Sequence, residues 1–168
     1  MLTLYDLVAR QAGDHPSATA LHFKGHDLTF LALQERIDQC ALLLSSRGVM
    51  AGDRFGLVLR NSPEFVITFL ALMKLGAQAV PVNFLLKADE ITYIFEDAGV
   101  VGLMTQPAFL GNILEARKKL PRLREVMVAG SRGAESERTL APGVSSFEQL
   151  MNTMDTMGSD PSGQTPWC

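Results

Sequence analysis

The sequence is poor in the residues from which disulfides and metal sites are built. Among its 168 residues are two cysteines and three histidines. Cys40 and Cys168 are too few for a disulfide framework, and neither has a partner at the spacing of metal ligands. We therefore expect a protein of the reducing cytoplasm.

The sequence also lacks an excess of charge and a long apolar run. The 15 Lys and Arg against 18 Asp and Glu give a net charge of −3, without the cationic excess that nucleic acid requires. The longest apolar region, Phe65 to Leu75, falls short of the ~20 residues that span a bilayer. No basic segment followed by an apolar one opens the chain, so no secretory signal is predicted. With 47% hydrophobic residues, we expect a soluble, folded protein with no transmembrane segment and no nucleic-acid partner.

Helical and strand-like patterns alternate along most of the chain. Apolar residues at helical spacing predict helices over Tyr5–Ala12, Thr29–Gly48, Pro63–Leu75, Lys87–Ala98 and Pro107–Leu120. Short apolar segments predict strands over Thr19–Phe23, Arg54–Leu59, Ala79–Val82, Val100–Thr105 and Glu125–Ala129. The first strand also has a partner arm, His26–Leu28, across a Lys24-Gly25 turn. This alternation predicts the α/β class, with a mostly parallel sheet and helices on both faces.

The helix at 63–75 has the clearest local signals. Ser62 can cap its start, Pro63 suits the first helical position, and Gly76 ends it. Because the helix is apolar nearly all round, we expect it to be buried on more than one side.

The pattern weakens after Ala129. A polar stretch covers 130–138, and only Phe147–Met151 suggests another helical turn. From 152 onward no period survives. We therefore expect an α/β domain over residues 1–150 and an irregular or disordered tail over 151–168.

No motif of enzyme chemistry stands out. The chain contains no G-x-G-x-x-G, G-x-x-x-x-G-K-[ST] or G-x-S-x-G string. His22 and His26 flank a predicted turn, but exposed positions on a hairpin are a better interpretation of both, and of His15, than a metal pair. Cys40 lies on the apolar stripe of its helix, which favours packing over nucleophilic chemistry.

One basic cluster could meet an anionic ligand or a lipid head group. Its members are Arg117, Lys118, Lys119, Arg122 and Arg124. Cations at the end of a helix complement its negative pole, and we favour that structural interpretation. The residues themselves thus predict no catalytic, cofactor-binding or metal-binding residue.

Two strings nevertheless carry a resemblance. Residues 52–65 (GDRFGLVLRNSPEF) and 72–83 (LMKLGAQAVPVN) resemble the N-terminal region of AMP-forming acyl-CoA synthetases. These enzymes belong to the adenylate-forming superfamily, with nonribosomal-peptide adenylation domains and firefly luciferase. The same resemblance extends to Leu28-Thr29-Phe30 and to residues 89–98 (DEITYIFEDA) of a predicted helix. The resemblance runs from Leu4 to Leu150, is most specific over 52–98, and favours members that act on fatty acids.

The resemblance implies a two-step reaction. A carboxylate attacks ATP to give an acyl-adenylate and pyrophosphate, and the thiol of coenzyme A then displaces AMP. The family's phosphate loop ending in Pro-Lys-Gly, its acidic ribose-binding residue and its catalytic lysine lie downstream of the matched region. The string Ser162-Gly163-Gln164-Thr165-Pro166 lacks that lysine and most of the glycines. No catalytic residue is therefore carried over, and the sites for ATP, Mg²⁺ and CoA are expected in the missing downstream part.

The resemblance thus implies the incomplete N-terminal part of the adenylate-forming fold, inactive alone. Its partner would be the missing C-terminal portion of the enzyme, or a second copy joined through apolar surface left uncovered. An alternative is a stand-alone α/β module for interaction or small-molecule binding. An unrelated flavodoxin-like signalling domain is a third, but it requires acidic residues at strand ends, whereas Asp53 precedes its strand.

Overall fold

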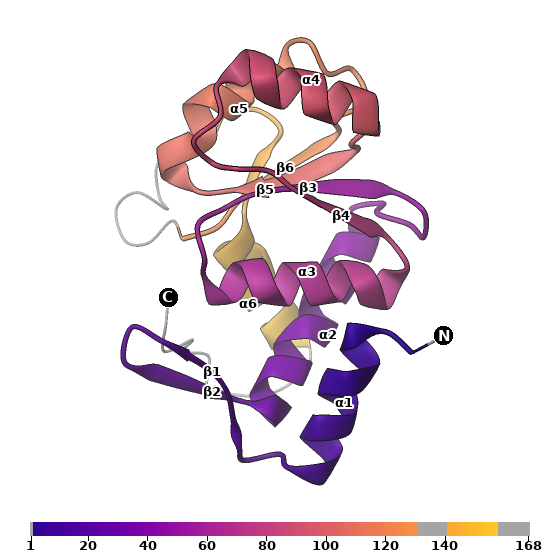
Figure 1. Ribbon diagram of the computed structural model, residues 1–168, viewed down its shortest axis with the longest axis vertical. Coiled ribbons are helices and arrows are strands. Elements are labelled where there is room, and N and C mark those ends of the chain that lie inside the picture. The colour runs from indigo at the N-terminus through magenta and orange to yellow at the C-terminus, as the bar shows by residue number, and fades with distance from the viewer. Residues whose placement is uncertain (1, 131–140, 158–168) are drawn as a thin grey trace.

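A parallel sheet forms the centre of the molecule. The structure, a computed structural model, describes residues 2–130 and 141–157 (Figure 1). Within them the sheet has five strands in the order β4-β3-β5-β6-β7, and every neighbouring pair is parallel. The strands are β3 (Arg54–Val58), β4 (Gln78–Pro81), β5 (Gly102–Thr105), β6 (Glu125–Val128) and β7 (Val144–Ser146). The predicted parallel α/β architecture is confirmed.

Helices cover both faces of this sheet. They are α1 (Leu4–Asp14), α2 (Phe30–Ser46), α3 (Pro63–Leu75), α4 (Ala88–Ala98), α5 (Leu110–Arg117), which follows the 3-10 turn η1 (Pro107–Phe109), and α6 (Phe147–Met157). Helices α4 and α5 lie on one face, and α2, α3 and α6 on the other (Figure 1). Helix α1 packs outside α2 and α3, and the antiparallel hairpin of β1 (Thr19–Phe23) and β2 (His26–Thr29) lies beside α2. No helix of the described residues has the length and apolar character of a membrane span.

Each face of the sheet has its own apolar core, because side chains alternate along a strand. On β3, Phe55 and Leu57 point into the core under α2 and α3, while Val58 points into the core under α4 and α5. On β5, Met104 points into the core under α2 and α3, and Leu103 points into the core under α4 and α5. All five side chains are fully buried, so the strands read as continuous apolar runs.

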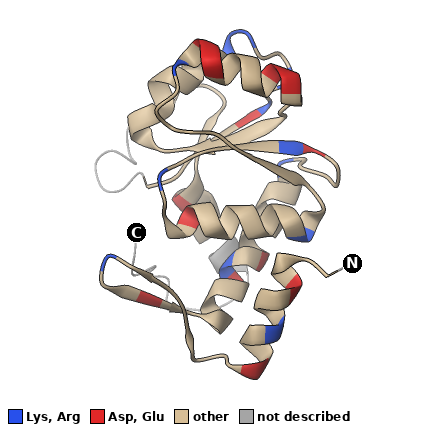
Figure 2. Cartoon of the chain, in the orientation of Figure 1, with Lys and Arg blue, Asp and Glu red and all other residues tan. Residues whose placement is uncertain are grey.

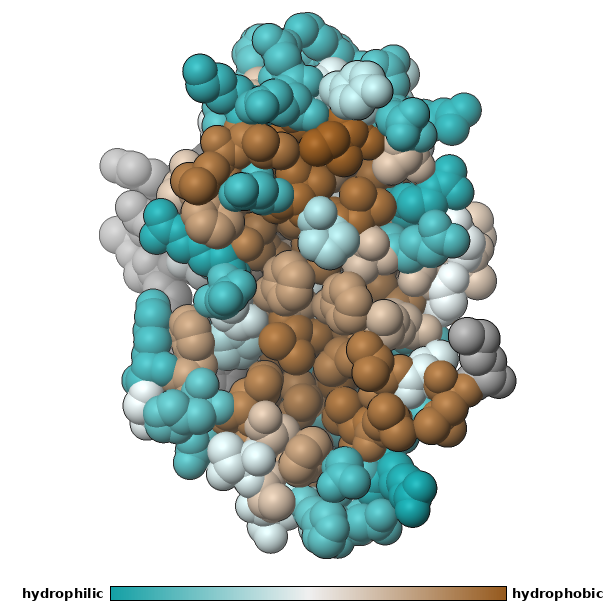
Figure 3. Space-filling model, in the orientation of Figure 1, coloured by the Kyte–Doolittle hydropathy of each residue, from teal (hydrophilic) through white to brown (hydrophobic). Residues whose placement is uncertain are grey.

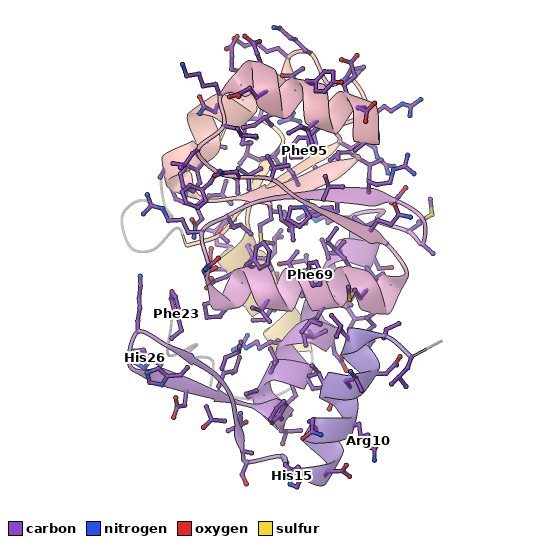
Figure 4. The ribbon with its side chains drawn as sticks, in the orientation of Figure 1. Arg10, His15, Phe23, His26, Phe69 and Phe95 are labelled. Atoms are coloured by element: carbon purple, nitrogen blue, oxygen red, sulfur yellow. The ribbon has the colours of Figure 1, made fainter. Side chains whose placement is uncertain are left out.

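Two strand glycines make room for aromatic rings. A β-carbon at Gly56 would lie 2.6 Å from Cζ of Phe95, the residue of α4 labelled in Figure 4. A β-carbon at Gly102 would lie 2.7 Å from Cε2 of Phe55, which pairs with it on the neighbouring strand. Large rings can therefore lie directly against the backbone at these positions.

Helix α3 forms as its sequence signals predict. The Ser62 side chain accepts a hydrogen bond from the Phe65 N–H, and Gly76 ends the helix with a left-handed φ of 71°. Its only charged residues, Glu64 and Lys74, lie near its two ends, as Figure 2 shows. All its other residues are buried or half-buried, so the predicted burial on more than one side is confirmed.

A polar cluster joins the three helices α1, α2 and α3. Lys74 Nζ lies 2.7 Å from Asp38 Oδ1 and donates to the Tyr5 hydroxyl at 2.9 Å. The Tyr5 hydroxyl in turn donates to Asp38 at 3.0 Å. Partial burial lowers the pKa of Lys74, but its bonds to Asp38 and Tyr5 outweigh this and raise the pKa above its ordinary value.

The chain beyond residue 141 is more regular than its sequence indicates. Strand β7 was not predicted, and α6 continues to Met157, so residues 151–157 are helical rather than irregular. Within this extension the Thr153 hydroxyl donates to the Gln149 and Leu150 carbonyls one turn earlier. The remaining residues of the expected tail, 158–168, lie outside the described residues.

Candidate functional site

The order of the strands indicates where a ligand would bind. The chain passes from β3 to β4 on one side, and then crosses to β5 on the other side of β3. In open α/β sheets, ligands bind at the carboxyl ends of the strands where the order reverses in this way. Here that position lies between the ends of β3 and β5. Flavodoxin-like sheets share this strand order, so the order alone does not separate a flavodoxin-like domain from the adenylate-forming fold that the sequence resembles.

Four residues meet at this position, and we call them the Arg60 cluster: Arg60, Phe84, Gln106 and Phe109. The Arg60 N–H, just after β3, donates to Gln106 Oε1, just after β5, at 3.2 Å. The Phe84 and Phe109 rings stack with their centroids 5.0 Å apart. The Arg60 guanidinium lies 5.6 Å and 5.5 Å from these two centroids. The cluster therefore joins the loops that follow β3, β4 and β5.

The Arg60 cluster has the chemistry of a binding surface rather than of a catalyst. Arg60 is exposed, and in the described part of the chain its guanidinium has no hydrogen-bond or ion-pair partner. Its N–H donors suit a phosphate or carboxylate, and the half-buried rings suit a planar or apolar group. Leu85, 75% exposed, extends the apolar surface.

Farther along the same edge, Glu148 lies in the first turn of helix α6. The Gly130 N–H, at the end of β6, donates to its Oε1, and the Ser146 hydroxyl donates to Oε2 at 3.3 Å. Burial raises the pKa of Glu148 above its ordinary value, and the nearby charge of Glu64 adds to this effect. The hydrogen bonds from Gly130 and Ser146 oppose the shift, and they hold the carboxylate as a link between β6 and α6.

The basic cluster of the sequence lies at the opposite edge of the sheet, between α5 and β6. Four of its five cations, all except Arg122, have partners within the described residues of the fold. The Arg117 guanidinium donates to the carbonyls of Pro142 and Gly143. Lys118 pairs with Glu115, Lys119 with Asp89, and Arg124 with Asp53. The pair of Lys119 and Asp89 raises the pKa of the lysine and lowers that of the carboxyl. These contacts support the structural interpretation of the cluster.

The histidines do not converge on a metal site. His22 lies on β1 and contacts the Asp27 carboxylate on β2. His26 is the first residue of β2, and His15 directly follows α1; Figure 4 labels both. Within residues 2–130 and 141–157, no three His, Cys, Asp or Glu side chains are placed to hold a metal ion. The string 162–166 and Cys168 lie outside these residues.

Cys40 is a packing residue. Its side chain is fully buried between α2 and α3, with Sγ 3.9 Å from the Thr68 hydroxyl. Burial raises the pKa of the thiol to about 12, and the contact with Thr68 offsets this only in part. A thiol with this pKa is almost fully protonated at neutral pH and cannot serve as a nucleophile.

Sequence reasoning missed the Arg60 cluster. Its members come from three separate loops, and no spacing along the chain links them. A usable signal was the position of Arg60 and Gln106, each directly after a predicted apolar strand. Residues at such positions gather at one edge of a parallel sheet.

Comparison with known families identifies the class of protein. The model of the AMP-binding enzyme family matches residues 8–162, which is most of the chain. The chain therefore belongs to the AMP-binding enzyme family, and it corresponds to the N-terminal region of an adenylate-forming acyl-CoA synthetase.

Individual relatives agree with this membership. The chain is 29% identical over 149 residues to the medium/long-chain-fatty-acid–CoA/3-oxocholest-4-en-26-oate–CoA ligase of Mycolicibacterium smegmatis, covering 89% of this chain and 27% of that protein. It is 32% identical over 110 residues to gramicidin S synthase 2 of Aneurinibacillus migulanus, covering 66% of this chain and 2% of that one. The chain thus spans only about a quarter, or far less, of the length of these relatives.

Solved structures show the same fold. The anthranilate CoA ligase AuaEII, in complex with anthranoyl-AMP, matches with a TM-score of 0.80 at 30% identity, over 89% of this chain and 27% of that one. The fatty acyl CoA synthetase of Mycobacterium tuberculosis matches with a TM-score of 0.70 at 26% identity, over 73% and 25% of the two chains. This membership contradicts the alternative of an unrelated flavodoxin-like domain.

Proposed function

We propose that this chain is the N-terminal structural part of an AMP-forming acyl-CoA synthetase that acts on fatty acids or related carboxylic acids. In that reaction a carboxylate attacks ATP to form an acyl-adenylate and pyrophosphate, and CoA then displaces AMP. The supporting observation is the match over 89% of this chain but 27% of the fatty-acid–CoA ligase of Mycolicibacterium smegmatis. We assign residues 1–150 to the N-terminal α/β part of the AMP-binding domain.

This part contributes the parallel sheet as a scaffold, and the carboxyl edge of that sheet as a surface for ligand binding. The Arg60 cluster lies at the carboxyl ends of β3 and β5, where ligands of open α/β sheets bind. The described residues do not gather the donors that would hold Mg²⁺, so we assign no Mg²⁺-dependent step to them. We propose that the sites for ATP, Mg²⁺ and CoA are completed downstream of this chain, and that the chain alone is inactive. We also propose that the complete enzyme works in the cytoplasm.

The test is pyrophosphate release with ATP, Mg²⁺ and a panel of fatty, sterol-derived and aromatic carboxylic acids. The 168-residue chain is measured beside the same sequence extended downstream, with reactions lacking the acid as blanks. We expect release only from the extended protein. Release from the short chain would contradict the proposal and would point to a phosphate site within these residues.

A second candidate is a stand-alone α/β module, favoured by one observation. Every apolar side chain of α3 is buried or half-buried, so α3 is partly covered by the described residues themselves. Against it, Leu2, Leu4 and Leu7 are 73%, 52% and 44% exposed, and apolar atoms gather over α3 and α1 in Figure 3. A monodisperse chain that binds no hydrophobic dye would support the module, whereas dye binding and self-association support the fragment.

A further inference from the structure

We propose that Arg60 is a positioning residue: its guanidinium clamps the loops after β4 and β5 onto the end of β3, and so fixes the shape of the sheet's carboxyl edge. This proposal depends on the proposed function in one respect only: the proposed function supplies the ligand that binds at this edge. The clamp itself is a property of the described chain and can be tested without any ligand.

The contacts of Arg60 reach both of these loops. Its backbone N–H is bonded to Gln106 in the loop after β5. Its guanidinium lies against the rings of Phe84, in the loop after β4, and of Phe109, in η1. The order β4-β3-β5 places β3 in the middle, so a residue at the end of β3 has both neighbouring loops within reach.

The side chain suits this task for a chemical reason. A guanidinium is flat and delocalised, so it can lie over aromatic rings while its N–H groups remain in water. The two rings also stack on each other, with an interplanar angle of 27°, so the three groups support one another. A lysine ammonium would keep the charge but not the flat surface, and a glutamine would lose the charge and keep only a smaller, neutral amide plane.

Holding these loops matters because their other hydrogen bonds are mostly local. In the loop after β4, the Leu85 and Leu86 N–H groups donate to Asn83, and the Leu86 carbonyl accepts from Asn112 at 3.4 Å. In η1, the Phe109 N–H donates to the Gln106 carbonyl. The amides of Leu85, Leu86 and Phe109 are therefore local reporters of loop opening.

The experiment measures amide hydrogen exchange by NMR on the full 168-residue chain with R60Q, R60K and, as a matched control, R10Q. Arg10, labelled in Figure 4, is an exposed arginine on α1 that pairs with Asp14, and α1 packs on α2 and α3. We expect R60Q to speed exchange at the three reporter amides by about two- to fivefold for each ring that the guanidinium no longer covers. R60K restores part of the protection, and R10Q leaves it unchanged. The core amides of β3 and β5 keep their rates in all variants.

Two results would overturn the clamp. Unchanged exchange at the reporters in R60Q would show that Arg60 holds nothing, and a uniform rise that includes the core amides would show a loss of global stability instead. A third arm adds inorganic phosphate. If phosphate slows the reporters in the parent chain but not in R60Q, Arg60 is an anion site and not a clamp. Pyrophosphate release plays no part in this readout, so failure of the clamp and failure of the proposed function are distinguishable.

Discussion

Replacing Gly56 with alanine should destabilise the chain, although alanine usually stabilises relative to glycine. Gly56 lies in β3, the middle strand, under the buried ring of Phe95. An alanine β-carbon would meet Cζ of that ring at 2.6 Å and Cβ of Leu103 at 3.1 Å. Neither contact can relax cheaply, because the ring is enclosed by the core and Leu103 Cβ is fixed to its strand.

The magnitude follows from two opposing effects. Forcing an extra methyl group into a packed core costs about 1–3 kcal/mol. Restricting the unfolded chain returns about 0.4–1 kcal/mol. Taken at the middle of each range, the net loss of unfolding free energy is about 1.3 kcal/mol, which lowers Tm by roughly 3–5 °C in a domain of this size.

The assay is thermal and urea unfolding followed by circular dichroism. Gly111→Ala is the matched control, because a β-carbon there meets nothing within 4 Å, and it should hold or raise Tm. Adding Phe95→Leu to Gly56→Ala should recover part of the lost stability. The packing argument is refuted if Gly56→Ala alone is as stable as the parent chain.

Three further predictions concern buried or paired polar groups. Lys74→Met should lower the unfolding free energy by about 0.5–1 kcal/mol, and a double-mutant cycle with Tyr5→Phe should show coupling; a coupling of zero would count against the polar cluster. In a Cys168→Ser background, Cys40 should react with a thiol reagent only after denaturation, since its pKa is raised to about 12, and rapid labelling of the native chain would contradict its burial. Because the pKa of Glu148 is raised, its folded form holds a proton more tightly, so its contribution to the unfolding free energy falls as pH rises above the ordinary value of 4.5. Glu148→Gln should flatten that decline in urea unfolding across a pH series, and parallel curves would disprove it.

The elements that could be predicted from sequence have signals that are local. Helix α3 carries its cap, its first-turn proline and its terminating glycine within fourteen residues of one another, and the structure places each as expected. The Lys24-Gly25 turn specifies the hairpin in the same way. Strand β7 has only three residues, too short for any alternation to show.

What could not be predicted depends on contacts between distant residues. The order of the strands is fixed by how helices pack on the two faces, and no single segment encodes it. The Arg60 cluster exists only because β4 and β5 lie on either side of β3 in register, with Leu57 opposite both Pro81 and Met104. The same register brings Arg60 beside the stacked rings of Phe84 and Phe109, which are far apart in sequence.

The central position of β3 has a consequence for how the chain folds during synthesis. Strand β3 leaves the ribosome before either of its neighbours, and it must wait for β4 and then β5. Strands β6 and β7 then join one side in the order of their translation. We expect the sheet to form outward from β3, the first of its strands to be translated. Each strand that joins then presents a new edge to the next strand that leaves the ribosome.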